Sequence, residues 1–99
     1  MTLVVTDAAE RHRYEAHLER TLAGFLDYVA KRDRIALIHT EVPAAFGGHG
    51  VAAGLTRFAL DDARQRGLKV IVICPYVRRY LEKHPEDMDI VVGPSTEAE

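Results

Sequence analysis

Residues 39–55 read HTEVPAAFGGHGVAAGL, and this stretch decides the fold of the chain. A polar strand end is followed by Pro43, by three glycines within four residues, and by an apolar pattern that begins at Val51 with the period of a helix. A glycine-rich turn that leads into a helix presents backbone N–H groups, and such groups bind phosphate. The stretch therefore predicts a strand–turn–helix unit whose turn can hold an anion.

The residues before this unit predict an antiparallel meander. Tyr14–Leu18 alternates apolar and polar side chains, which is typical of a half-buried strand. Leu22–Val29 and Ile35–Val42 are two more apolar segments, separated by the charged residues 31–34. A short strand is expected at Leu3–Val5. Three or four antiparallel strands therefore precede the glycine turn.

A helix and a buried strand are expected after the glycine turn. The helix should end at Gly67, because glycine is favoured just after a helix C-terminus. Leu68–Cys74 is rich in β-branched residues, which indicates a buried strand. A connecting helix makes this strand parallel to Ile35–Val42, with a right-handed crossover. The apolar helix face is expected to contain Val51, Leu55, Phe58, Ala59 and Ala63.

The last part of the chain predicts one more helix and a short strand. Pro75 suits a first helical position, so we expect a helix over Tyr76–Lys83 that Pro85 stops. Asp89–Val92 is expected to be the last strand. Residues 93–99 are predicted to form a polar, mobile tail.

Composition narrows the classes of function. The 99 residues are expected to form a single domain, and the net charge of −2, without a basic stripe, argues against a nucleic-acid partner. The longest apolar runs are too short to span a bilayer, and the first residues lack the pattern of a signal peptide. The single cysteine excludes an internal disulfide. We therefore expect a cytoplasmic protein that does not bind membranes.

Four motifs lie along the chain: HTEVP at 39–43, GxGVAxxL at 48–55, ARxxGLKV at 63–70 and CPYVxxYLxxHPE at 74–86. Together they resemble the GNAT-type N-acetyltransferases, in particular their short, single-domain YjdJ-like branch, over about residues 14–91. The resemblance implies an α/β GNAT fold, in which a mixed, splayed sheet of a meander and a β–α–β unit is flanked by helices. It also implies acetyl-CoA as cosubstrate, an amine as acceptor, and no metal.

The resemblance places the CoA pyrophosphate on the glycine turn, between the two splayed parallel strands. Gly47 and His49 stand where related proteins often carry a long polar side chain and a lysine, so the backbone and the helix dipole are expected to hold the phosphate. Backbone donors near Val42 would polarise the thioester carbonyl. The expected cofactor-binding set is Val42, Gly47, Gly48, His49, Gly50, Val51 and Ala52.

His39 and Glu41 are candidate catalytic residues. They are two apart on a strand, so they are expected to share a face with each other and with Ile35 and Leu37. Imidazole titrates near neutral pH, and acetyl transfer to an amine requires a base, which Glu41 would orient. The alternative is a hydrogen-bonded histidine at the edge of the core beside a solvated glutamate.

Cys74 and Tyr80 complete the candidate catalytic set. Cys74 ends a strand directly before a helix, where a helix N-terminus favours a thiolate. The resemblance places it near the thioester, as an acyl carrier or as a mere contact, and a buried packing role is the alternative. Tyr80 stands where these enzymes often keep a tyrosine that protonates the leaving thiolate, or it is a packing residue. Three cations on the same helix are expected to be solvated: Arg78, Arg79 and Lys83. The alternative is that one of them reaches the 3′-phosphate of the nucleotide.

The sequence thus predicts an acetyl-CoA-dependent N-acetyltransferase. A CoA-binding module without significant catalysis, in which His39 and Cys74 are structural, is the alternative, and a plain interaction domain is a third hypothesis. A polyamine, a small amine, a peptide N-terminus and a protein lysine are all compatible acceptors. Asp87 replaces the aromatic residue that usually follows HPE, which argues against a ring contact near the last strand.

Overall fold

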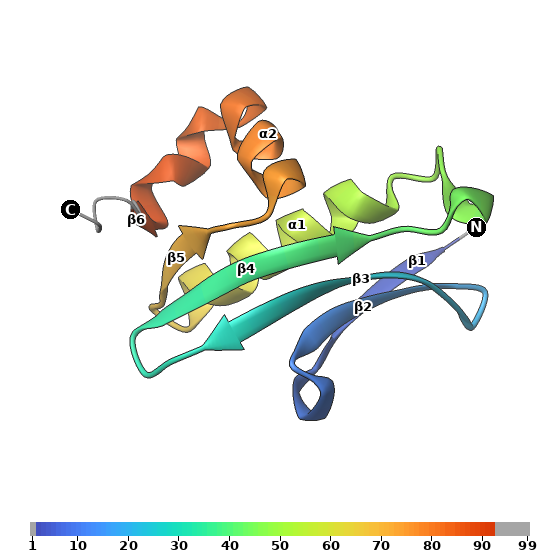
Figure 1. Cartoon of the computed structure of the whole chain (residues 1–99), viewed down its shortest axis with the longest axis horizontal. Coiled ribbons are helices and arrows are strands. Elements are labelled where there is room, and N and C mark those ends of the chain that lie inside the picture. Colours follow the sequence, from blue (N-terminus) through green and yellow to red (C-terminus); the bar gives the residue numbers. More distant parts are fainter. Residues whose placement is uncertain (1, 93–99) are drawn as a thin grey trace.

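The computed structural model describes residues 2–92 (Figure 1), so the tail predicted at residues 93–99 lies outside the described part. Its main elements are β1 Leu3–Ala8, β2 Arg13–Leu18, β3 Thr21–Ala30, β4 Arg34–Glu41, α1 Val51–Gln65, β5 Lys69–Val72, α2 Pro75–Lys83 and β6 Val91–Val92. Short 3₁₀ helices are η1 Ala9–Arg11, η2 Ala44–Phe46 and η3 Pro85–Ile90.

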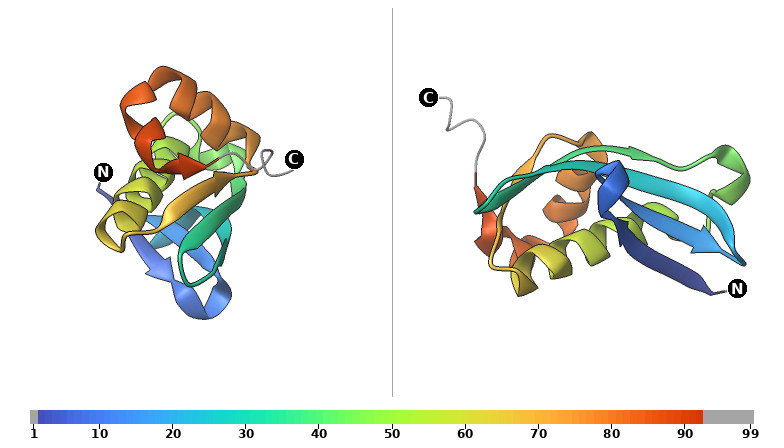
Figure 2. Two further views of the ribbon diagram at one scale, coloured as in Figure 1. Left: turned by 90° about the vertical axis from the view of Figure 1, so that its left-hand side faces the viewer. Right: turned by 90° about the horizontal axis from the view of Figure 1, so that it is seen from below.

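The six strands form one mixed sheet in the order of the sequence. β1 to β4 are antiparallel neighbours, and β4–β5 and β5–β6 are parallel pairs. The two successive crossovers step in the same direction across the sheet, so right-handed connections place both helices on one face. Figure 2 shows this arrangement, in which α1 and α2 cover one side of the sheet and leave the other side open. The predicted α/β GNAT fold is confirmed.

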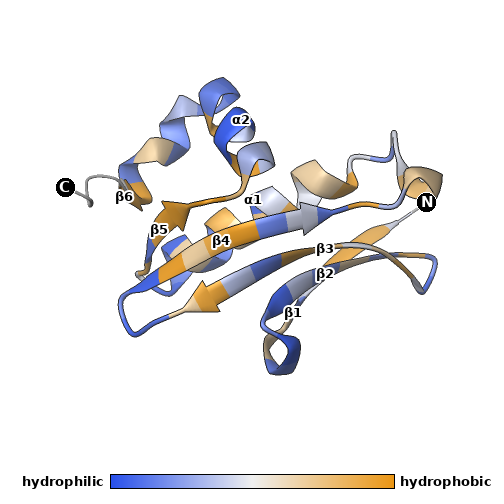
Figure 3. Cartoon of the chain, in the orientation of Figure 1, coloured by the Kyte–Doolittle hydropathy of each residue, from blue (hydrophilic) through white to orange (hydrophobic). Residues whose placement is uncertain are grey.

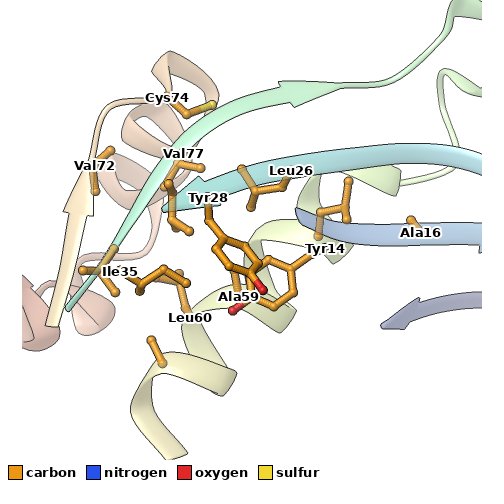
Figure 4. Close-up of a cluster of buried hydrophobic side chains, with 14 of the residues drawn as sticks. Tyr14, Ala16, Leu26, Tyr28, Ile35, Ala59, Leu60, Val72, Cys74 and Val77 are labelled. Atoms are coloured by element: carbon orange, nitrogen blue, oxygen red, sulfur yellow. The ribbon is translucent and has the colours of Figure 1, made fainter. Parts of the chain in front are cut away.

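The core lies between the covered face of the sheet and the two helices (Figure 4). The Tyr14 ring packs on Tyr28 and on Phe58, and its hydroxyl donates to Asp62 at 2.8 Å. Phe58 is only partly buried, whereas Leu60 is fully buried on the expected apolar face. The helix is therefore held by an apolar stripe slightly wider than the sequence predicts.

A bulge in β4 changes the face on which the candidate base lies. Tyr28 pairs with Leu37 and Asp27 pairs with His39, so Ile38 is an extra residue in β4. An extra residue reverses the alternation of side chains beyond it. His39 consequently lies on the open face, opposite to the buried Leu37, and the expectation that they share a face is wrong. Figure 3 shows β4 changing from apolar to polar towards its end.

Two strands are shorter than the sequence predicts. β5 covers Lys69–Val72 rather than 68–74, because the chain leaves the sheet after Val72 and enters α2. β6 covers only Val91–Val92, and the residues expected to begin it belong to η3.

An ion-pair cluster explains why η3 replaces the start of the last strand. Asp87 is 4% exposed and accepts two hydrogen bonds from Arg57, at 2.8 and 2.9 Å, and one from Arg64 at 3.2 Å. Hydrogen bonding to Arg57 lowers the pKa of the Asp87 carboxyl below its usual value, and the positive charge of Arg64 lowers it further. Arg64 also pairs with Asp89. These contacts hold η3 against α1, and the buried Asp87 carboxylate is their common acceptor.

Candidate active site

The sheet opens between its two central parallel strands. β4 and β5 pair from Arg34–Lys69 to Leu37–Val72, and the described residues contain no further pairs beyond that point. The carbonyl of Leu37 accepts hydrogen bonds from the N–H groups of both Ile73 and Cys74, at 3.0 and 2.9 Å. Figure 1 shows β4 continuing in its direction while β5 turns away towards α2. The predicted splay is therefore present, and its apex is the Leu37 carbonyl.

The glycine turn ends in a helix N-terminus without a side-chain cap. Gly50 is the N-cap of α1 with a φ of 73°, a left-handed conformation that favours glycine. No side chain among the described residues caps this end, and the first turn contains no acidic residue. The first N–H groups of a helix have no partner within the helix. They are consequently available, with the positive end of the helix dipole, to an anion.

Gly24 of β3 holds this turn close to the sheet. A Cβ atom at Gly24 would lie 2.8 Å from the carbonyl oxygen of Glu41 and about as close to the side chains of Val42 and Val51. Only glycine fits at this approach of the turn to β3. A glycine inside a strand is itself an indication of such close packing.

A pocket of about 310 Å³ lies between α1 and α2, on the covered face of the sheet. Tyr80 lines it and stacks on His84 with 4.1 Å between ring centroids, and Tyr76 lies beside it. Burial raises the pKa of the Tyr76 hydroxyl. The residues lining the pocket are Ala53, Tyr76, Arg79, Tyr80, Glu82, Lys83 and His84. Because Ala53 belongs to the first turn of α1, the pocket adjoins the uncapped helix end.

Cys74 lies at the apex of the splay and is only 2% exposed. Its Sγ is 3.2 Å from the Oγ1 of Thr40, and its carbonyl accepts the N–H of Arg78 in α2. Thr40 was not among the predicted site residues, because only the bulge turns its side chain to the covered face. Cys74 is therefore packed between β4 and α2, with its thiol beside a hydroxyl.

His39 and Glu41 form a pair on the open face. The Nε2 of His39 is 2.9 Å from the Oε1 of Glu41, and both side chains are 55% exposed. The Phe25 ring lies edge-on to the imidazole, with centroids 6.5 Å apart. Because a carboxylate only accepts hydrogen bonds, Nε2 is the donor, and Nδ1 is left free to accept a proton. The predicted pairing of the two side chains is thus present, on the face opposite to the pocket.

Three of the remaining candidates, Val42, Gly47 and His49, lie in the loop between β4 and α1, and Arg78 lies in α2. Val42 is partly buried with its side chain towards Gly24, and Gly47 and His49 are exposed. Arg78 is not free for a ligand, since its guanidinium donates to the carbonyl of Val72 at 3.1 Å. The chain thus brings the turn, the apex and the pocket together on one side of β4.

A mixed sheet that opens between parallel strands beside an uncapped helix end is the architecture of an acetyltransferase of the GNAT type. The chain matches the family model described as GCN5-related N-acetyl-transferase over residues 13–90, and it belongs to this family. Protein NATD1 of Mus musculus is 41% identical, and that of Xenopus tropicalis 39% identical, over 59 residues that cover 60% of this chain and 53% of each relative. The chain therefore spans about half the length of the curated relatives it matches.

Solved structures agree with the family assignment. The solution structure of a GCN5-like protein from Staphylococcus aureus has a TM-score of 0.68 and 25% identity, and the match covers 92% of this chain and 89% of that one. A ribosomal-protein-alanine N-acetyltransferase from Brucella melitensis biovar Abortus 2308 shares the fold, with a TM-score of 0.62, 21% identity and coverage of 72% and 58%. The predicted resemblance to the GNAT superfamily is confirmed, whereas the individual site residues stay predictions.

Two further observations concern residues 2–92. These residues contain no group of three or more His, Cys, Asp or Glu side chains placed to hold a metal ion. Neither α1 nor α2 is long and apolar enough to cross a membrane.

Proposed function

We propose that this chain is an N-acetyltransferase that transfers the acetyl group of acetyl-CoA to an amine. The observation that carries the proposal is the joint placement of the splay, the uncapped N-terminus of α1 and the adjoining pocket. The pyrophosphate of CoA needs hydrogen-bond donors, which the first N–H groups of α1 supply. The long arm that carries the thioester needs a gap in the sheet beside them, which the splay supplies. The family membership supports the same cosubstrate.

CoA would bind along the covered face. Its pyrophosphate would rest on the N–H groups of residues 48–52, and its thioester would lie in the splay near the Leu37 carbonyl. Arg79 and Lys83 line the pocket beyond the helix end, where they can contact the nucleotide phosphates. Because Arg78 is engaged with Val72, these two are the cations that we propose for that role.

Transfer would follow a direct route. The amine nitrogen attacks the thioester carbonyl carbon, the C–N bond forms, and the C–S bond breaks. Nδ1 of His39 takes the proton lost by the amine, with Glu41 holding the ring, and the hydroxyl of Tyr80 gives a proton to the CoA thiolate. The burial of Cys74 supports a direct transfer over an acyl-cysteine, since an acyl group on a packed thiol would need room that the core does not offer.

A CoA-binding module without significant catalysis is the second candidate. It is favoured by the separation of the His39–Glu41 pair from the pocket, because the two lie on opposite faces of β4. In that case the histidine would be a solvated side chain of the open face.

Calorimetry separates the proposal from its alternatives. We expect the purified protein to bind acetyl-CoA and CoA at micromolar to millimolar concentrations, and an acceptor screen to give turnover that depends on acetyl-CoA. Binding without turnover would identify the binding module. Absence of binding at millimolar acetyl-CoA would exclude both.

A further inference from the structure

The open face of the sheet carries an apolar row. Val29, Ala36, Ile71 and Val92 are register partners from β3 to β6, and we call these four residues the outer row. Val29 is 49% exposed, and Val92 also has an exposed side chain. No helix of residues 2–92 covers the row, because α1 and α2 lie on the other face (Figure 2). Apolar side chains that stay exposed in such a row are typical of a contact surface.

Cations border the outer row at the β3–β4 turn. A hollow of about 670 Å³ is lined by Val29, Ala36 and Ile71 of the row together with residues 31–34 of this turn. Arg34 pairs with the neighbouring Asp33, whereas Lys31 and Arg32 form no ion pair with any described residue. The hollow thus combines an apolar floor with positive charges that have no acidic partner in the described chain.

The opposite end of the same face carries the candidate base. Asp27 is the cross-strand partner of His39, and it lies one same-face position from Val29 along β3. The proposed CoA pocket lies on the covered face, so an amine that gives its proton to His39 must approach from the open face. The distance along the strand from Asp27 to Lys31 is about 13 Å, which is longer than a small amine reaches.

We propose that the open face receives a polypeptide acceptor whose lysine amine enters beside His39 and Glu41, whose neighbouring apolar residues cover the outer row, and whose acidic residues pair with Lys31 and Arg32. This inference rests on the proposed function, and it names the acceptor class. Charge complementarity selects acidic flanks, because Lys31 and Arg32 repel basic ones. The face is not covered by a helix of residues 2–92, and such an open surface suits an extended chain better than a small enclosed substrate.

Two peptides test the acceptor class. Each has blocked ends and the centre Thr-Val-Thr-Lys-Thr-Val-Thr, which places valines on the same face of an extended chain as the lysine, flanked on both sides by three glutamates in one peptide and by three arginines in the other. The symmetric sequence makes the direction of binding irrelevant. We expect kcat/KM for the glutamate-flanked peptide to exceed that of the arginine-flanked peptide, and that of Nα-acetyl-lysine amide, by about tenfold or more.

Matched variants test the surface. Arg32→Glu should lower kcat/KM for the glutamate-flanked peptide by about fivefold, whereas Arg20→Glu, in the hairpin turn at the other end of β3, should leave it unchanged. Val29→Thr should weaken the same reaction, and Val4→Thr, at an equally exposed position of β1, should not. Turnover of Nα-acetyl-lysine amide should be the same in all four variants.

A binding measurement makes the inference independent of turnover. The glutamate-flanked peptide with glutamine in place of lysine, labelled for fluorescence anisotropy, should bind the wild type in the presence of CoA more tightly than Arg32→Glu. Equal acetylation of the two peptides, or equal effects of Arg32→Glu and Arg20→Glu, would overturn the inference while calorimetric CoA binding leaves the proposed function intact. Acetylation of Nα-acetyl-lysine amide but of neither peptide would overturn it as well. Absence of acetyl-CoA binding would remove the proposed function itself.

Discussion

The side chains on the two faces of the sheet are held in place by different interactions. On the covered face, Tyr14, Leu55 and Val70 are packed into one core with α1 and α2, and the turn, the splay and the pocket border that core. On the open face, His39 and Glu41 are half exposed and are held by their mutual hydrogen bond and the edge of Phe25. Packing therefore specifies the proposed cosubstrate side, whereas His39 and Glu41, on the proposed acceptor side, contribute little to the packing of the fold.

One cross-strand row of the open face contains both a buried and an exposed glutamate. Glu15, Phe25 and Glu41 are cross-strand neighbours on β2, β3 and β4. Glu15 is buried under Arg11 and Arg13, while Glu41 is exposed beside His39. The guanidinium of Arg13 also lies over the Phe25 ring, at 4.3 Å from its centroid. Arg11 and Arg13 therefore cover the end of the row at Glu15, which we call the sealed end, and the end at Glu41 stays accessible to solvent.

The largest effect should come from the open face. His39→Ala is expected to lower the rate of acetyl transfer by about 10²- to 10⁴-fold, because the amine loses its general base. Only a neutral imidazole accepts a proton, so any rise of the wild-type rate with pH that comes from this base should be absent from the variant. Stopped assays of acetyl transfer across pH 5.5 to 9, together with calorimetry of CoA binding, measure both quantities.

CoA affinity serves as the control for the histidine variant, and it should be unchanged. A variant that loses CoA affinity and melts at a lower temperature would instead assign His39 to the structure. A pH profile that stays the same after substitution would remove it as the base.

The covered face should respond next, through the glycine turn. Gly50→Val is expected to weaken CoA binding by about 100-fold, because a side chain there obstructs the approach of phosphate to the helix end. Gly67→Val is the matched control: Gly67 has a φ of 70°, close to that of Gly50, and a Cβ at either position would meet no atom within 4 Å. Both variants should lose about 1–2 kcal/mol of stability from backbone strain.

Calorimetry and thermal unfolding of the two glycine variants separate the two effects. Equal CoA affinity in both would show that the turn does not hold the phosphate.

A smaller effect is expected at the sealed end of the open face. Hydrogen bonding to Arg11, with Arg13 beside it, lowers the pKa of Glu15 to about 2 from its ordinary value of 4.5. A carboxyl with a depressed pKa stabilises the fold above its unfolded pKa and loses this contribution as the pH falls towards 2. Glu15→Gln should therefore reduce the free energy of unfolding by about 1–2 kcal/mol at pH 7, after allowance for solvent screening.

Denaturant unfolding at pH 7, 4 and 2.5 checks the Glu15 prediction. The difference between wild type and Glu15→Gln should shrink across this range, and a difference that does not depend on pH would contradict it. Glu41→Gln, on the exposed end of the same row, should leave stability unchanged at every pH.

The smallest effect on transfer is expected at the apex of the splay. Cys74→Ala should leave turnover within about threefold of wild type and cost about 1 kcal/mol of stability, because a buried thiol is lost without the loss of a nucleophile. Mass spectrometry after incubation with acetyl-CoA alone should detect no acetyl adduct on the wild type. An adduct that an amine then discharges would establish the acyl-cysteine route instead.

The parts of the fold that follow from local pattern could be predicted from the sequence. Alternation in Tyr14–Leu18, the helical period from Val51 and the glycines at 47–50 each act over a few residues, and the structure has a strand, a helix and a turn at those places. The antiparallel meander and the parallel return of β5 were also predicted from the pattern, and the likeness of four motifs to the GNAT family added the splay between the two parallel strands. The expected pairing of His39 with Glu41 also depended only on their spacing.

The features that were missed depend on partners far away in the sequence. The extra residue Ile38 is defined only by the pairing of β4 with β3, so its reversal of faces could not be predicted from β4 alone. Asp87 is buried because Arg57 and Arg64 reach it from α1. A pattern within one segment contains neither the partner nor the distance, and both corrections belong to tertiary structure.

The bulge in β4 has a consequence for water. Because it directs His39 to one side and Thr40 to the other, a single strand separates the side from which the proposed acceptor would approach from the packed side where the proposed thioester would lie. Because only the backbone of β4 lies between the two sides, the nitrogen of an amine at the edge of this strand could reach the carbonyl carbon of the thioester. The packed side around Cys74, which is only 2% exposed, offers little room for water, so a thioester held at the apex would be protected from hydrolysis.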